Sequence, residues 1–290
     1  MPATEKGPGP RAGQRVALLA NPDSGSGDAG SVEGELRRLG AEVFALEPDE
    51  ADAAVRLEPD RIVIAGGDGS LARPAAAAAR AGIPIAVVPV GTANDFARHL
   101  GVPEDTRDAC ALALAGEPRP LDLAWLERRP FLNVASVGLA PAAARRADAL
   151  KGALGPLAYA VGAVRAGVRA EPVRCAVICD GKPWFEGDAW QVTVACTGAF
   201  GGGSSVDADP HDGRLDVVVI EANGRAALVR HAWGLRRGTL AEQQGAAKRL
   251  CRTAELRFDG RRRFNVDGEL VETESCSFSI EPGAVQVVAP

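Results

Sequence analysis

The sequence has no long apolar run, and a helix that spans a membrane is therefore not expected. Such a helix needs roughly 18 consecutive apolar residues, and the best candidate, at residues 158–168, is interrupted by Arg165. The first residues are polar, rich in Gly and Pro, and lack the apolar stretch of a signal peptide. We expect residues 1–13 to form a disordered tail.

Closely spaced cysteines and histidines are also missing, which argues against a zinc site. No two cysteines have the C-x-x-C spacing, and His99, His211 and His231 are far apart in the sequence. Most cysteines lie in apolar runs, which predicts buried, reduced thiols of a cytosolic protein. The cysteines are Cys110, Cys175, Cys179, Cys196, Cys251 and Cys276.

The chain has no excess of basic charge, and we therefore expect no nucleic-acid partner. It has 33 Lys and Arg against 38 Asp and Glu, a formal net charge of −5. The basic residues are nevertheless concentrated at 224–263 and 140–170. These two stretches are interpreted either as solvated faces or as a patch that meets an anionic surface.

The first 120 residues alternate apolar strands with helical stretches. We expect strands at 15–20, 42–46, 61–65 and 85–89, and helices at 31–39, 52–57, 71–81, 94–100 and 106–115. This repeat of strand, loop and helix predicts an α/β domain with a parallel sheet over residues 14–121.

After about residue 121 the pattern changes to short strands separated by turn signals such as VDGE. We expect strands at 173–179, 190–197, 214–221, 254–258, 263–266, 276–280 and 285–288, and helices at 140–151 and 156–170. The pattern predicts a mainly antiparallel β domain over residues 122–290. The sequence leaves two places open for the last strand, which either stays in this domain or packs on the first domain.

Three glycine-rich loops follow three of the predicted parallel strands. They are NPDSGSGDAG at 21–30, GGDGS at 66–70 and GTAND at 91–95. Ligands bind beyond the carboxyl ends of the strands in such sheets, and glycine lets backbone N–H groups approach phosphate oxygens. The loops therefore predict one phosphate-binding rim. No Walker A loop is present.

The first loop also fits the dinucleotide fingerprint G-x-G-x-x-G, with Glu47 at the end of the next strand. However, four residues separate strand and first glycine, whereas the fingerprint needs a tight turn. A dinucleotide site would also leave the other two loops unexplained. We therefore disfavour it.

Two loop positions have both a functional and a structural interpretation. Asp68 is suited either to holding Mg²⁺ or orienting phosphate-binding backbone, or to capping the helix that begins at Leu71 or closing an Asp-Gly turn. Thr92 and Asn94 are suited either to nucleotide contacts or to the plain start of a helix.

Taken with later motifs, these loops give the sequence a resemblance to the diacylglycerol-kinase-like lipid kinases, the superfamily that also holds sphingoid-base kinases. The matching motifs cover nearly the whole chain. They are NPxSG at 21–25, GGDGS at 66–70, PxGTxNDFAR at 89–98, NVASVG at 133–138, DGxLDVV at 212–218 and DGE at 267–269.

The resemblance implies an α/β nucleotide-binding domain, a β-sandwich domain and an active site between them. It implies ATP and Mg²⁺ as cofactors and a lipid hydroxyl as the phosphate acceptor. It also implies a cytoplasmic enzyme that binds peripherally to the membrane surface. A homodimer is compatible with the resemblance. ATP would bind at Asn21, Pro22, Ser24, Gly25, Gly66, Gly67, Asp68, Gly69, Ser70, Gly91, Thr92, Asn94 and Asp95.

The resemblance also implies catalytic carboxylates. Asp68 would act at the phosphates, and an acidic residue of the DGE motif, Asp267 or Glu269, would take the proton of the lipid hydroxyl. A carboxylate within hydrogen-bond reach can do this. Without the resemblance, VDGE is an ordinary hairpin turn.

The sequence departs from the family pattern at three places. Ser70 stands where Thr is more usual, and Leu46 and Glu47 stand where a nucleotide-binding Thr often follows the second strand. In many bacterial members two acidic residues begin the DGxLD motif and hold a structural Mg²⁺, but here His211 precedes Asp212. Asp212 and Asp216 then form either a metal site or an acidic turn.

Two other functions remain open from the sequence. A kinase of a soluble acceptor, NAD or a sugar phosphate, shares the GGDG loop, but the later motifs of those kinases are not found. A non-catalytic regulator that binds nucleotide or lipid is compatible with the same scaffold. The acceptor within the lipid class, diacylglycerol or a related lipid, is not specified by the sequence.

Overall fold

The computed structural model describes residues 13–20, 28–138, 171–200, 204–222, 246–273 and 276–290. It divides the chain into two compact units, Met1–Leu123 with Gly283–Pro290, and Ala124–Pro282. Strands β5 (Pro118–Leu126) and β17 (Cys276–Val288) contribute residues to both units. The helices predicted at 140–151 and 156–170 lie outside the described residues.

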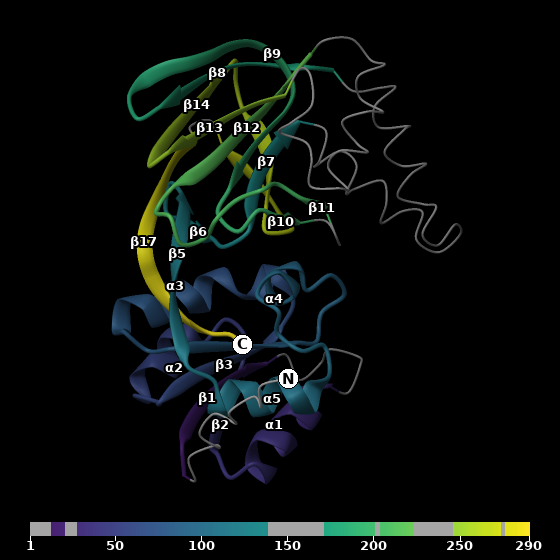
Figure 1. The fold of residues 1–290 in the computed structure, drawn as a ribbon, viewed down its shortest axis with the longest axis vertical. Coiled ribbons are helices and arrows are strands. Elements are labelled where there is room, and N and C mark those ends of the chain that lie inside the picture. The colour runs from purple at the N-terminus through teal and green to yellow at the C-terminus, as the bar shows by residue number, and fades with distance from the viewer. Residues whose placement is uncertain (1–12, 21–27, 139–170, 201–203, 223–245, 274–275) are drawn as a thin grey trace, which may run out of the picture. The chain divides into compact units, whose positions relative to one another are not determined.

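The first unit contains a parallel sheet accompanied by helices (Figure 1). Its strand order is β2-β1-β3-β4, and the end of β17 pairs with β4. Most residues of β1, β3 and β4 are buried, as expected for parallel strands covered on both faces. The strands are β1 (Arg15–Ala20), β2 (Glu42–Leu46), β3 (Arg61–Gly66) and β4 (Ile85–Pro89).

The helices of this unit form two packed pairs, α1 with α5 and α2 with α3. Crossovers between parallel strands are right-handed. The chain runs from β1 outward to β2 and then back past β1 to β3, so α1 covers one face of the sheet and α2 and α3 the other. The reversal puts a switch point between β1 and β3, where open α/β sheets bind ligands. The helices are α1 (Asp28–Arg38), α2 (Ala51–Arg56), α3 (Ala72–Ala81), α4 (Asp95–His99) and α5 (Thr106–Ala115).

The second unit is a β sandwich of antiparallel strands. The order is β16-β15-β7-β9-β8-β14-β17, and β12 pairs with both β9 and β13. The long strand β9 changes partners along its length, pairing with β8 through residues 182–189 and with β7 through residues 191–195. The strands are β6 (Arg129–Phe131), β7 (Val134–Gly138), β8 (Val173–Cys179), β9 (Lys182–Ala195), β10 (Ala199–Phe200), β11 (Ser204–Ser205), β12 (Leu215–Glu221), β13 (Ala246–Cys251), β14 (Thr253–Phe258), β15 (Arg262–Val266) and β16 (Glu269–Thr273).

The main core of the second unit is built around aromatic rings. Phe264 lies 6.1 Å from Phe278 and 6.0 Å from Phe258 between ring centroids, and Phe131 lies 6.2 Å from Phe278. Alternate residues of the surrounding strands, such as Val192 and Val194, complete the cluster. Tilted and edge-on ring pairs of this kind stabilise a core beyond their buried area.

All six cysteines are free and buried, as predicted. Burial raises the pKa of the Cys110 thiol to about 12 and that of Cys175 to about 11. These thiols are therefore uncharged at neutral pH, which fits a packing role.

Two sequence-based expectations about strands are wrong. The strands predicted at 276–280 and 285–288 form one continuous strand, β17, which passes through Pro282 and Gly283. Gly283 has a φ of +60°, and its N–H donates to the Asp122 carboxylate at 2.7 Å. This local anchor lets the strand continue through residues that normally signal a turn. The sequence pattern also did not predict strands β5, β6, β7, β10, β11, β13 and β16.

Within the described part of the chain, the helices are too short or too polar to cross a bilayer.

The aromatic cluster makes a prediction about stability. Replacing the fully buried Phe264 by Ala should lower the free energy of unfolding by about 3–5 kcal/mol, because it removes a large ring and leaves a cavity. Phe258, which is only partly buried, is the matched control, and Phe258→Ala should cost clearly less. Urea unfolding measures both values. Equal losses at the two positions would contradict this account of the core.

Candidate functional site

The GGDGS loop continues directly from β3 into a short 3-10 turn at Asp68–Ser70. The Ser70 hydroxyl donates to the carbonyl of Gly67 at 2.7 Å. A side chain at Gly66 would begin 2.1 Å from the Ser70 oxygen. A methyl group at Gly66 would therefore displace the Ser70 hydroxyl that closes the loop.

The GTAND loop folds back against the GGDGS loop, with backbone next to backbone. A Cβ atom at Gly91 would lie 2.5 Å from the Cα of Gly67. Asn94 has a φ of +51°, and its side chain accepts from the N–H of Gly91 at 3.0 Å and donates to the Gly91 carbonyl at 2.8 Å. Asn94 thus closes the turn around Gly91, and its side chain does not cap helix α4.

Asp68 joins the two loops. Its carboxylate accepts from the backbone N–H of Asp95 at 3.0 Å and of Phe96 at 2.8 Å. These are the first two amides of α4, so Asp68 caps that helix from a distance of 27 residues in the sequence. The sequence offered Asp68 as a possible cap of the helix that follows it, but α3 has no side-chain cap and the carboxylate binds the amides of α4 instead. Asp95 is itself buried and lies 3.3 Å from the guanidinium of Arg98.

The two loops form one rim at the carboxyl ends of neighbouring strands. Gly66 at the end of β3 pairs with Pro89 at the end of β4. Glycine backbone and the exposed Thr92 line this rim, and such backbone can approach anionic oxygens closely. Of the residues predicted to bind nucleotide, Gly66 to Ser70 and Gly91 to Asp95 come together here. Asn21, Pro22, Ser24 and Gly25 lie outside the described residues.

The DGE motif is the tight turn of the β15–β16 hairpin. Val266 pairs with Glu269, and the two residues between them, Asp267 and Gly268, have φ values of +47° and +92°. Two positive φ angles define a type I′ turn, which favours Asp-Gly. The N–H of Gly268 donates to the Asn265 side chain at 2.8 Å.

The Asp267 carboxylate is turned inward and holds a backbone segment. It accepts from the N–H groups of Leu132 at 2.7 Å, Asn133 at 3.0 Å and Val134 at 2.9 Å. The residue is 7% exposed, and its own N–H donates to the Val134 carbonyl at 3.0 Å. With three backbone donors on its two oxygens, the carboxylate is a structural anchor of this segment.

Glu269 has a different environment from Asp267. Its side chain is 48% exposed and forms an ion pair with the guanidinium of Arg129. Arg129 was not singled out in the sequence, because a lone arginine in a short turn gives no signal of its partner. Thr197 was also not singled out, because its partner lies far away in the sequence. Its hydroxyl donates to the Asn133 side chain at 2.6 Å and fixes the segment that Asp267 holds.

The predicted metal ligands Asp212 and Asp216 do not form a ligand cluster in the structure. Among the described residues, no group of three potential metal-ligating side chains is close enough to hold an ion. Asp212 accepts from the N–H of Arg214 at 2.9 Å within an acidic turn. Asp216 is almost completely buried, and burial raises the pKa of its carboxyl, opposed by the nearby Lys248 ammonium.

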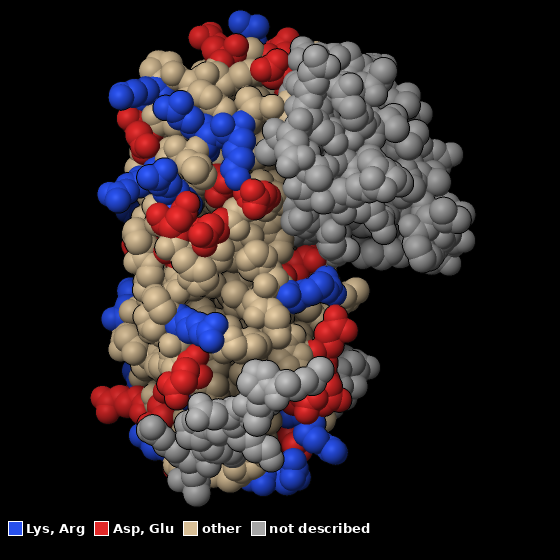
Figure 2. Space-filling view, viewed as in Figure 1, with Lys and Arg blue, Asp and Glu red and all other residues tan. Residues whose placement is uncertain are grey.

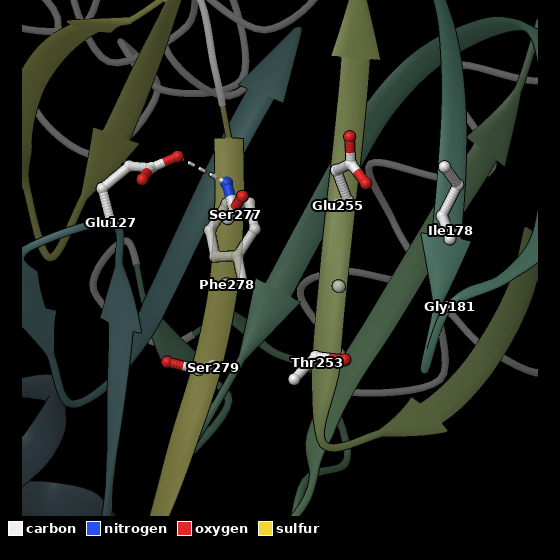
Figure 3. Close-up of a pocket in the computed structure, with 9 residues that line it drawn as sticks. Glu127, Ile178, Gly181, Thr253, Glu255, Ser277, Phe278 and Ser279 are labelled. Carbon is white, nitrogen blue, oxygen red and sulfur yellow. Dashed lines mark hydrogen bonds between the residues drawn. The ribbon is translucent and has the colours of Figure 1, made fainter.

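A separate shallow pocket of about 400 Å³ lies on the strands β8, β14 and β17 (Figure 3). Glu127, at one side of it, accepts from the N–H of Ser277 at 2.9 Å. Glu255 is paired with Arg257. None of the predicted site residues lines this pocket, which is formed by Glu127, Ile178, Gly181, Thr253, Ala254, Glu255, Ser277, Phe278 and Ser279.

The parallel sheet with its glycine rim and the β sandwich with its DGE hairpin correspond to two domain families of kinases. Residues 15–126 match the diacylglycerol kinase catalytic domain family. Residues 133–289 match the YegS C-terminal NAD kinase beta sandwich-like domain.

Whole-chain comparisons agree with the two domain matches. The chain is 27% identical to a diacylglycerol kinase of Mycobacterium tuberculosis over 95% of both chains. It is 30% identical to the diacylglycerol kinase of Bacillus subtilis over 75% of this chain and 73% of that one. It is 31% identical to a probable lipid kinase YegS-like of Stenotrophomonas maltophilia over 80% of this chain and 79% of that one.

The fold is also that of a solved structure, a putative diacylglycerol kinase from Bacillus anthracis. The TM-score is 0.79 at 23% identity, over 96% of this chain and 97% of that one. The chain belongs to the diacylglycerol-kinase-like lipid kinase family.

The different environments of Asp267 and Glu269 predict different effects on stability. Asp267→Asn should lower the free energy of unfolding by about 1–3 kcal/mol, because an amide nitrogen would face buried N–H groups and leave a donor unpaired. Asn tolerates the positive φ, so the turn itself is not strained. Glu269→Gln, on the same hairpin, breaks only an exposed ion pair and should cost less than about 1 kcal/mol. Urea unfolding of both variants measures the difference, and an equally small loss would contradict the anchoring role.

The contact between the two glycine loops makes a second prediction. Gly91→Ala should lower the melting temperature, because the new methyl group would collide with the backbone at Gly67. Gly34→Ala is the control, since Gly34 lies in α1 with open space around it. That substitution should stabilise the protein by about 0.5–1 kcal/mol. Thermal unfolding distinguishes them, and a neutral Gly91→Ala would show that the loops are not in close contact.

Proposed function

We propose that the protein is an ATP-dependent lipid kinase that transfers the γ-phosphate to the hydroxyl of diacylglycerol or a related lipid. The relatives named diacylglycerol kinase and probable lipid kinase support the reaction class. The observation that carries the proposal is the close approach of two glycine loops, at Gly67 and Gly91, at the carboxyl ends of β3 and β4. Asp68 joins the two loops through its hydrogen bonds.

The glycine rim is suited to the phosphates of a nucleotide. Backbone at Gly67, Gly69 and Gly91 can come close to phosphate oxygens because no side chain intervenes, and the Thr92 hydroxyl adds a donor. Asp68 is a positioning residue in this proposal, since its oxygens already bind the amides of Asp95 and Phe96. Mg²⁺ bound with the nucleotide would neutralise phosphate charge during transfer.

Glu269 is the better candidate for the base. The reaction forms a bond between the lipid oxygen and the γ-phosphorus and breaks the bond from that phosphorus to the oxygen shared with the β-phosphate, leaving ADP. The hydroxyl proton must go to a carboxylate within reach. The carboxylate of Asp267 is occupied by three backbone donors, whereas Glu269 is half exposed and pairs with the side chain of Arg129.

A lipid acceptor implies contact with a membrane surface from the cytoplasm. On the face drawn in Figure 2, basic side chains of the described residues are interspersed with acidic ones. Leu250 and Leu270 are large apolar side chains that are exposed. One lies on β13 and the other on β16. The predicted basic stretch at 140–170 and residues 224–245 of the stretch at 224–263 lie outside the described residues, so the proposed contact still rests on their charge.

The test is a transfer assay with ATP radiolabelled at the γ-phosphate, Mg²⁺ and a mixed lipid extract, followed by partition into organic solvent. Label should enter the organic phase, and chromatography then names the lipid. Glu269→Gln should reduce the transfer rate by about 10²–10⁴, the usual contribution of a general base. Glu272→Gln is the matched control, because Glu272 lies on the same strand and also pairs with an arginine, Arg263. It should retain full activity.

Other outcomes would contradict the proposal in different ways. Label that moves from ATP to a water-soluble product other than inorganic phosphate would indicate a soluble acceptor such as NAD or a sugar phosphate. Nucleotide binding without transfer to any lipid of the extract would favour a non-catalytic regulator. Equal activity of Glu269→Gln and the unsubstituted protein would remove Glu269 from the chemistry while leaving the kinase assignment intact.

A further inference from the structure

The second unit buries a carboxylate that its hydrogen bonds do not satisfy. Asp216, at the start of β12, is 1% exposed. It shares a face of the strand with Val218 and Ile220, which belong to a small apolar cluster. Among the described residues, neither carboxylate oxygen has a donor in hydrogen-bond geometry. A buried carboxylate without a compensating charge is strongly unfavourable.

The compensating charge comes from the neighbouring strand. Asp216 pairs with Leu250 and Val218 pairs with Lys248 across β12 and β13, so Lys248 is the diagonal neighbour of Asp216 on the same face. The ammonium lies 2.6 Å from Asp216 Oδ1. It also donates to the backbone carbonyl of Asp207 and lies 3.9 Å from the carboxylate of that residue.

The oxygen atoms around this ammonium resemble the ligands of a hard metal ion. Carboxylate and carbonyl oxygens are what Mg²⁺ takes as ligands, at 2.0–2.1 Å in octahedral geometry. The residues do not fit such an ion here, because the Lys248 ammonium already contacts Asp216 Oδ1 and would repel a second cation. Asp212, the other expected ligand, accepts from the N–H of Arg214.

We propose that the Lys248 ammonium is the resident cation of this site and stands in for a structural divalent metal. The lysine neutralises Asp216 and joins β13 to the acidic turn that contains Asp207. The fold of the second unit is then independent of Mg²⁺. This assignment does not depend on the proposed function, because it concerns the protein without nucleotide.

The first test uses the unsubstituted protein without nucleotide. Its melting temperature should be the same in EDTA and in excess Mg²⁺. A melting temperature that falls in EDTA and recovers with stoichiometric Mg²⁺ would overturn the proposal, since it would show that a metal supports this fold. This comparison needs no variant, so it remains decisive if a substitution prevents folding.

The second test removes the cation. Lys248→Met keeps the length of the side chain and should lower the melting temperature by about 10 °C, because it leaves Asp216 buried and unpaired. Adding Asp216→Asn in the same chain should recover part of that loss, and Mg²⁺ should raise the melting temperature of the single variant only. Arg249→Met is the control, since Arg249 is the exposed neighbour on β13, and it should melt like the unsubstituted protein.

The remaining outcomes of the second test count against the proposal. If Lys248→Met melts like the unsubstituted protein, the ammonium does not neutralise Asp216. If its melting temperature is lowered but is restored neither by Mg²⁺ nor by Asp216→Asn, Lys248 acts through packing alone. Recovery by either route supports the assignment of Lys248 as the resident cation.

Discussion

The site residues of this protein depend on one interaction, a carboxylate that accepts hydrogen bonds from consecutive backbone amides. Asp68 binds the first two amides of α4, and Asp267 binds the amides of residues 132–134. Glycine turns have little conformational preference of their own, so a rigid shape must come from such anchors. Charged acceptors suit this role because their hydrogen bonds are roughly twice as strong as neutral ones. In each unit, one aspartate thus fixes a backbone segment that lies far from it in the sequence.

The hydrogen bonds of each carboxylate distinguish the acidic residues that position backbone from those that are available for chemistry. The carboxylate of Asp267 is occupied by backbone amides, whereas Glu269, two residues further along the hairpin, keeps a half-exposed carboxylate. The same principle extends to Asp216, which has no backbone donor within the described part of the chain and relies on the charge of Lys248. The environment of each carboxylate, more than its presence in a motif, determines what it is able to do.

Much of the fold was predictable because apolar runs and glycine turns are local signals. The strands at 15–20, 42–46 and 85–89 and the hairpin turn at 267–268 follow directly from them. Strands β13 and β16, with sequences AAKRLC and ELVET, lie at sheet edges and carry too many polar residues to be recognised. The partners of Asp68, Asp267 and Asp216 lie 27 to 135 residues away. Such pairs arise from tertiary packing, and a sequence pattern does not reveal them.

The central claim is that, within the DGE motif, Asp267 holds backbone and Glu269 is the base. Amide hydrogen exchange tests this claim most directly. In Asp267→Asn, the amides of residues 132–134 should exchange faster, while those in the middle of β12 keep their protection. In Glu269→Gln, protection should be unchanged at both places, although phosphate transfer is lost. Unchanged exchange at residues 132–134 in Asp267→Asn would contradict the claim, because the carboxylate would then not be holding that backbone.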